Sequence, residues 1–153
     1  MKRILIIDDE EPGLDMLKEF FTDAGYEVVT AKDGKEALSK FAPGRFDCII
    51  SDLMMPGMDG LEVLKMARTV DGKVAFLMVT GSNSIDKAIQ SMKEGASDYI
   101  TKPFQLEDMM LRVERALQTK KREESIKRLT GLFIISIPLW IIIGIIFGIL
   151  WKK

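Results

Sequence analysis

Residues 4–9 read Ile-Leu-Ile-Ile-Asp-Asp, a short run of branched apolar residues that ends in two acidic ones. A second run, Cys-Ile-Ile-Ser-Asp at 48–52, ends in the same way. Runs of this kind, alternating with segments of helical periodicity, are typical of buried strands in a parallel sheet. Open α/β sheets place their ligand sites at the carboxyl ends of the strands, so we expect Asp8, Asp9 and Asp52 to converge there.

Three carboxylates at one place repel each other unless a cation joins them. Mg²⁺ is the hard cation that prefers oxygen ligands and uses few protein contacts. The sequence therefore predicts a divalent-metal site in which one carboxylate is free to react.

The rest of the chain to residue 117 alternates between strand-like and helix-like segments. Asp33 and Asp59 precede two of the helices and are expected to cap them. Five successive βα units with short connections wind right-handed into one parallel sheet. The expected strands, in addition to the first run, are 26–30, 46–52, 74–79 and 98–101. The expected helices are 11–24, 34–41, one from residue 60, one that starts at Ser84 or Asp86 and ends at about Glu94, and a long one from residue 104.

The charges are unevenly distributed. Residues 1–117 hold 15 Lys and Arg against 21 Asp and Glu, whereas residues 118–130 hold five basic and two acidic residues. Nucleic acid is not expected as a partner, because phosphate binding needs a basic face on the domain. The chain has no His and one cysteine, Cys48, so zinc and haem sites are disfavoured. Cys48 lies inside an apolar run and is expected to be a packed core thiol.

Residues 132–151, LFIISIPLWIIIGIIFGILW, carry no charge. A helix of about twenty residues covers about 30 Å, the thickness of a bilayer's hydrocarbon core. This pattern predicts one C-terminal transmembrane helix, with a buried hairpin or an oligomerisation peptide as alternatives. Residues 119–131 are predicted to be a basic helical stalk, and the positive-inside tendency then places a folded domain at 1–118 in the cytoplasm. Gly144 and Gly148 form a GxxxG pattern through which two spans could pair as a homodimer.

Four stretches carry a resemblance to a known family. They are ILIIDDE (4–10), DLMMPGMDGLEVL (52–64), VTGS (79–82) and GASDYITKPF (95–104). On these residues, the part of the chain from 1 to 118 resembles the receiver domain of two-component response regulators. The resemblance implies a flavodoxin-like, doubly wound five-stranded parallel sheet with the strand order 2-1-3-4-5.

The resemblance also implies residue roles. Asp52 would be the phosphoacceptor, and Lys102 would pair with an oxygen of the phosphoryl group. Thr80 would donate its hydroxyl to that group, and Tyr99 would swing inward after it as the second switch residue. The peptide bond between Lys102 and Pro103 would be cis.

For the metal, the resemblance implies a set of oxygen ligands around Mg²⁺. Asp9, Asp52 and the backbone carbonyl of Met54 would bind the ion, and Asp8 would act partly through water. The ion would offset carboxylate repulsion and spread charge during phosphoryl transfer.

The implied partner is a sensor histidine kinase, with a histidine phosphotransfer protein or a membrane complex as further candidates. The sequence shows no helix-turn-helix, no P-loop and no second catalytic set, so a DNA-binding output domain is not expected. The protein is expected to be a phospho-accepting switch rather than an enzyme. It would signal by protein contact at the cytoplasmic membrane of a bacterium or archaeon. The alternatives are a phosphorelay intermediate or phosphate sink, and a membrane docking scaffold.

Overall fold

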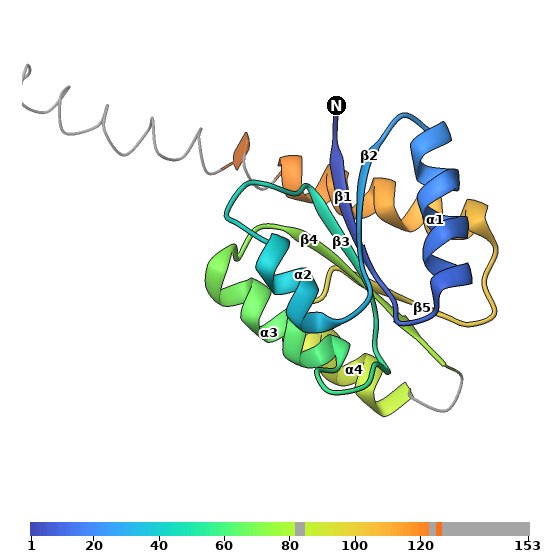
Figure 1. The fold of residues 1–153 in the computed structure, drawn as a ribbon. Helices are drawn as coiled ribbons and strands as arrows, with labels where there is room; N and C mark the ends of the chain where they lie inside the picture. Colours follow the sequence, from blue (N-terminus) through green and yellow to red (C-terminus); the bar gives the residue numbers. More distant parts are fainter. Residues whose placement is uncertain (82–84, 123–124, 127–153) are drawn as a thin grey trace, which may run out of the picture. The chain divides into compact units, whose positions relative to one another are not determined.

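The computed structural model describes residues 1–81, 85–122 and 125–126 of the 153-residue chain. One parallel sheet has the strand order β2-β1-β3-β4-β5, and helices alternate with the strands along the chain (Figure 1). This is the flavodoxin-like sheet that the sequence predicts. Its elements are β1 (Arg3–Ile7), α1 (Glu11–Asp23), β2 (Glu27–Ala31), α2 (Gly34–Lys40), β3 (Cys48–Asp52), α3 (Gly60–Val70), β4 (Ala75–Thr80), α4 (Ile85–Lys93) and β5 (Asp98–Thr101). A further helix covers residues 106–122.

The central strands are buried on both faces, because successive side chains of a strand point to opposite sides of the sheet. In β1, Leu5 and Ile7 belong to one hydrophobic cluster and Ile4 and Ile6 belong to the other. The same alternation continues in β3 and β4. It explains why these strands read as continuous apolar runs in the sequence.

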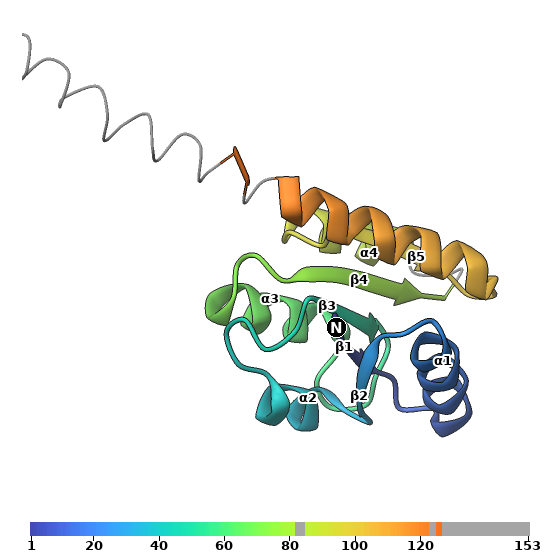
Figure 2. The same cartoon turned by 90° about the horizontal axis from the view of Figure 1, so that it is seen from above.

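Helices cover both faces of the sheet (Figure 2). One cluster is closed by buried side chains of α2 and α3, and the other by side chains of α1 and of helix 106–122. On helix 106–122, Met109, Val113 and Leu117 face the sheet and are buried. The helices therefore cover the two faces of the sheet. The polar residues at the carboxyl ends of its strands lie outside both hydrophobic clusters.

Two helices begin at the aspartates that the sequence predicts as caps. The side chain of Asp33 accepts a hydrogen bond from the amide of Glu36, and Asp59 accepts one from the amide of Glu62. At α3 the Glu62 side chain also accepts from the Asp59 amide, which completes a capping box. Both caps are confirmed.

Several element boundaries differ from the prediction. The strand expected over 46–52 begins only at Cys48, and most other bounds shift by one or two residues. The apolar run includes Phe46, which is buried in one of the two hydrophobic clusters but precedes the strand. Apolar periodicity reports burial rather than strand pairing, so it places the start of β3 too early.

Helix α3 starts unusually close to the end of β3. The Gly60 amide donates to the carbonyl of Leu53 at 3.0 Å. A Cβ atom at Gly60 would lie 2.2 Å from the backbone oxygen of Asp52, a distance that no side chain can occupy. Glycine is therefore required here by the approach of two backbone segments, and it brings the start of α3 beside Asp52.

Cys48 is fully buried in the cluster between the sheet and α1. Burial raises the pKa of its thiol to about 12, so the reactive thiolate is not formed at neutral pH. The prediction of a packed core thiol is confirmed.

The sequence predictions for the C-terminal part fall largely outside the described residues. The predicted transmembrane stretch 132–151, with Gly144 and Gly148, lies outside them entirely. Of the predicted stalk 119–131, residues 119–122 and 125–126 are described, and they are helical. Among the residues that the structure does describe, none of the helices is both long enough and apolar enough to cross a membrane.

Candidate functional site

The site is built at the carboxyl edge of the sheet. Asp8 directly follows β1, Asp52 is the last residue of β3, and Thr80 is the last residue of β4. Lys102 directly follows β5. Because all strands are parallel, these four side chains share one edge although up to 94 positions separate them in the sequence. This is the placement expected for a ligand site in an open α/β sheet.

Three carboxylates converge at this edge. One oxygen from each of Asp8, Asp9 and Asp52 lies within 4.8 Å of the others. Asp8 and Asp52 are only 5% and 7% exposed, while Asp9 is open to solvent. Closely spaced carboxylates with one solvent-facing member suit a hard divalent cation that keeps part of its water shell. The predicted convergence of the three aspartates is confirmed.

Lys102 supplies the positive charge among these carboxylates. Its Nζ atom lies 3.2 Å from Oδ2 of Asp8 and makes a shorter contact with Oδ2 of Asp52. Burial by itself lowers the pKa of Lys102, but its hydrogen bonds and charge interactions with Asp52 and Asp8 outweigh burial and raise the pKa. Lys102 is therefore positively charged throughout the neutral range and pairs with both buried carboxylates.

The backbone orients the same two carboxylates. Oδ1 of Asp52 accepts a hydrogen bond from the Met54 amide at 3.0 Å, and Oδ1 of Asp8 accepts one from the Glu10 amide at 2.9 Å. Each carboxylate thus has one oxygen held by the main chain and one shared with Lys102. Met54 follows Asp52 closely in the chain, so its backbone belongs to the site while its side chain is 54% exposed.

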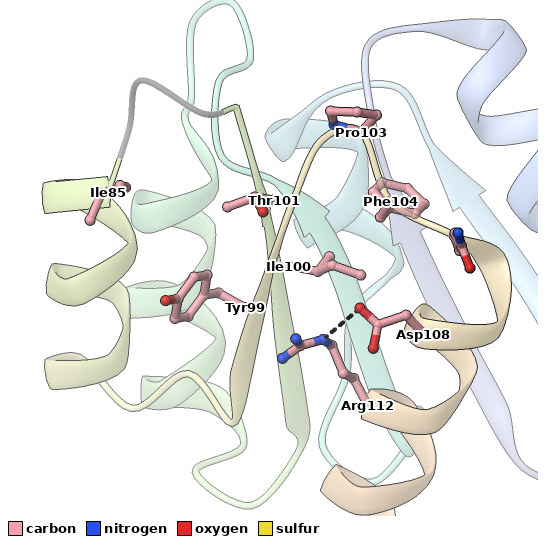
Figure 3. Close-up of a pocket in the computed structure, with 9 residues that line it drawn as sticks. Ile85, Tyr99, Ile100, Thr101, Pro103, Phe104, Asp108 and Arg112 are labelled. Carbon is pink, nitrogen blue, oxygen red and sulfur yellow. Dashed lines mark hydrogen bonds and ion pairs between the residues drawn. The ribbon is translucent and has the colours of Figure 1, made fainter.

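Thr80 and Tyr99 lie on neighbouring strands but do not bond to Asp52 in this structure. Thr80 is fully buried, and its hydroxyl donates to the Gly81 carbonyl at 2.9 Å. Tyr99 is partly buried against the cluster that α2 and α3 close. Figure 3 shows its ring directed from β5 toward α4. The Lys102–Pro103 peptide bond is cis.

Tyr99 also borders a hollow of about 570 Å³ beside β5 (Figure 3). Ile85 from the first turn of α4 and Phe104 from the loop after β5 contribute apolar walls. Arg112 contributes the charged side of the hollow, where its guanidinium donates to both carboxylate oxygens of Asp98 at 3.0 and 2.9 Å. The sequence did not predict the pair of Arg112 with Asp98, because the two residues lie on different elements. A second acidic partner of Arg112, Asp108, is four residues away on the same helix, which is the spacing that a sequence can show.

The comparisons with known proteins agree with this arrangement. The sequence model of the response regulator receiver domain family matches residues 4–114. The response regulator MprA of Mycobacterium bovis is 36% identical over 123 residues, which are 80% of this chain and 54% of that protein. The regulatory protein AtoC of Escherichia coli is 36% identical over 129 residues, 84% of this chain and 28% of that protein. The chain thus spans about half the length of MprA and less of AtoC.

Solved structures show the same likeness. A response regulator receiver domain protein from Clostridium thermocellum has a TM-score of 0.74 and 32% identity, and the match covers 79% of this chain and 98% of that one. NtrX from Brucella abortus has a TM-score of 0.78 and 30% identity, over 84% of this chain and 30% of that one.

The carboxylate cluster predicts a stabilising effect of Mg²⁺. At a Mg²⁺ concentration of about ten times the dissociation constant, binding to the folded state alone adds about 1.4 kcal/mol to the free energy of unfolding. We expect this gain as a rise in the thermal midpoint of the wild-type protein, followed by circular dichroism. Asp9→Asn removes the exposed carboxylate of the cluster and should lose most of the gain. Asp15→Asn, an exposed carboxylate of α1 outside the cluster, should keep it, and an equal gain in all three proteins would contradict a metal site here.

Proposed function

The chain belongs to the response regulator receiver family, and from this premise we propose that it is a phospho-aspartate switch in which Asp52 accepts a phosphoryl group from a sensor histidine kinase. The observation that carries the proposal is the setting of Asp52. Its carboxylate is nearly buried at the open edge of the sheet, between Lys102 and two further carboxylates. A carboxylate in this setting combines a nucleophilic oxygen with a cation beside it, which is what transfer of a phosphoryl group needs.

The transfer exchanges one bond for another. An oxygen of Asp52 attacks phosphorus, the bond from phosphorus to the kinase histidine nitrogen breaks, and an acyl phosphate forms on Asp52. Asp9, Asp52 and the carbonyl of Met54 would hold Mg²⁺, with Asp8 acting partly through water. When bound, the ion neutralises negative charge on the transferring group. Hydrolysis of the acyl phosphate by water returns the aspartate and releases inorganic phosphate. In this proposal the protein assists the phosphorylation and dephosphorylation of its own Asp52 and is not a classical enzyme.

Lys102 and Thr80 have distinct parts in the proposed switch. Lys102 already pairs with Asp52 and would transfer this charge-assisted contact to a phosphoryl oxygen. The hydroxyl of Thr80 would turn from the Gly81 carbonyl to the phosphoryl group. Tyr99 would follow inward and change the face formed by α4, β5 and helix 106–122, where a partner protein would bind.

That face has the composition of a protein contact. Ile85, Ile89 and Met92 lie on α4 and are 57%, 48% and 41% exposed. Their spacing of four and three residues aligns them along one side of the helix. Next to them is the hollow bordered by Tyr99 and Arg112. Exposed apolar side chains that gather along one helix face favour an interaction surface over isolated surface residues.

We also propose a location at the cytoplasmic membrane of a bacterium or archaeon. The support is the uncharged stretch 132–151 together with the five basic residues of 119–131 that precede it. Residues 132–151 would form the anchor, residues 119–131 the stalk, and residues 1–118 the cytoplasmic receiver domain. Signalling would then occur by protein contact near the membrane, and Gly144 and Gly148 would offer a way for two anchors to pair.

Substitution of the acceptor tests the phosphorylation. Asp52→Asn keeps the size of the side chain but removes the nucleophilic carboxylate, so labelling by a kinase or by radiolabelled acetyl phosphate should fall to background. Asp47→Asn, a control at the opposite edge of the sheet, should be labelled as the wild-type protein is. Labelled Asp52→Asn protein would refute the assignment. If partner binding is unchanged in Asp52→Asn, the result would favour a docking scaffold over a phosphorylation switch.

Thr80 tests the coupling between the site and the α4 face. Beryllofluoride, an analogue of the phosphoryl group, should change amide hydrogen exchange in residues 85–93 of the wild-type protein. Thr80→Val replaces the hydroxyl by a methyl group of similar size, and we expect it to make that change several-fold smaller. Thr69→Val makes the same replacement at an exposed position of α3 and should respond as the wild-type protein does. If beryllofluoride changes the hydrogen exchange of residues 85–93 in Thr80→Val as much as in the wild-type protein, the Thr80 hydroxyl does not couple the site to α4.

Deletion of residues 132–153 tests the anchor. The shortened protein should move from the membrane fraction to the soluble fraction and keep its Asp52 labelling. Removal of Lys152 and Lys153 alone leaves the apolar stretch whole, so this shorter deletion should stay with the membranes. A chain without residues 132–153 that still sediments with membranes would contradict the proposed anchor.

A further inference from the structure

Lys87 joins α4 to the loop that follows the proposed acceptor. Its Nζ atom lies 3.6 Å from the sulfur of Met54 and 3.7 Å from Oδ2 of Asp59. Met54 and Asp59 stand near the two ends of the loop between β3 and α3. One side chain of α4 therefore contacts this loop near both of its ends.

The loop is itself tied to Asp52. The Met54 amide donates to Oδ1 of Asp52 at 3.0 Å, and the Gly60 amide donates to the Leu53 carbonyl at 3.0 Å. Asp59 uses Oδ1 to cap α3, which leaves Oδ2 for Lys87. The hydrogen bond from the Met54 amide therefore joins this loop directly to the Asp52 carboxylate.

The start of α4 is also linked to the site through the chain. Ile85 and Lys87 belong to its first turn, which follows Thr80 by a few residues. In this arrangement the hydroxyl of Thr80 is bound to the Gly81 carbonyl. The first turn of α4 therefore begins close to Thr80 in the sequence and contacts the Met54 loop through Lys87.

We propose that Lys87 is a positioning residue that holds the first turn of α4 against the Met54 loop and favours the arrangement in which Thr80 is bound to Gly81. Loss of the contact shifts the population toward the arrangement in which Thr80 can reach a phosphoryl group. The proposal rests on the phosphorylation of Asp52 proposed above. It adds a specific restraint to that switch.

The expected effect is modest. Lys87 and Asp59 are 43% and 30% exposed at their side chains, so water and salt weaken their attraction. A partly exposed ion pair of this kind changes a population by about two- to fivefold. The labelling rate should change by the same factor, because only the responsive fraction of molecules reacts fast.

The test is a double-mutant cycle on the full chain. Its readout is the initial rate of Asp52 labelling by radiolabelled acetyl phosphate at saturating Mg²⁺ and low salt. Lys87→Gln removes the cation, and Asp59→Asn removes the anion while the amide oxygen still caps α3. We expect each variant to be labelled about two- to fivefold faster than the wild-type protein, and the double variant to be no faster than either.

Two further variants serve as controls. Lys87→Arg keeps the charge and should retain the wild-type rate. Lys93→Gln removes the same charge at the exposed other end of α4 and should also leave the rate unchanged. In high salt the wild-type rate should rise to that of Lys87→Gln, which itself should change little.

A purely electrostatic effect on the anionic donor gives a different pattern. Lys87→Gln would then slow labelling, Asp59→Asn would speed it, and the two effects would add in the double variant. That outcome, or an unchanged rate in Lys87→Gln, overturns the positioning role while leaving Asp52 as the acceptor. Absence of labelling in the wild-type protein would instead refute the proposed function itself.

Discussion

The attraction between Lys102 and two buried carboxylates is the interaction on which the site depends. Asp8 and Asp52 are almost out of contact with water, where two like charges at close range destabilise a fold unless they are compensated. Lys102 compensates both, and backbone amides hold the remaining oxygens. The same arrangement also sets an oxygen of Asp52, the proposed phosphoacceptor, beside a cation. Stability and chemistry therefore depend on the same contacts.

The sheet allows these charges to lie close together without disturbing the hydrophobic core. Each strand divides its side chains between two hydrophobic clusters, and helices cover both. Polar residues are then confined to the strand ends, where parallel order collects them at one edge. Gly60 adds to this by letting α3 begin against the Asp52 backbone. The loop between β3 and α3 is short. Hydrogen bonds of the Met54 and Gly60 amides hold it at its two ends, next to Asp52.

Much of the fold and of the site could be predicted from residue types and spacing. The apolar runs ending in Asp8 and Asp52 predicted strands and a carboxylate cluster, and Asp33 and Asp59 predicted the starts of two helices. These features depend on local periodicity and capping, which operate within a few residues. The start of β3 was placed too early because Phe46 is buried in the core but precedes the strand. Burial of a residue beside a strand and pairing within the strand give the same apolar pattern in the sequence.

The sequence by itself determined the class of fold, the three converging aspartates and, through its motifs, the receiver family. A strand that is buried on both faces needs a continuous apolar run, and acidic residues at its end are visible in the sequence as well. Only the tertiary structure decided which oxygen each group binds. It paired Lys102 with both carboxylates, Thr80 with Gly81, Arg112 with Asp98 and Lys87 with Asp59. Most of these contacts join different elements, and their geometry follows from packing helices onto the sheet rather than from the order of residues along the chain.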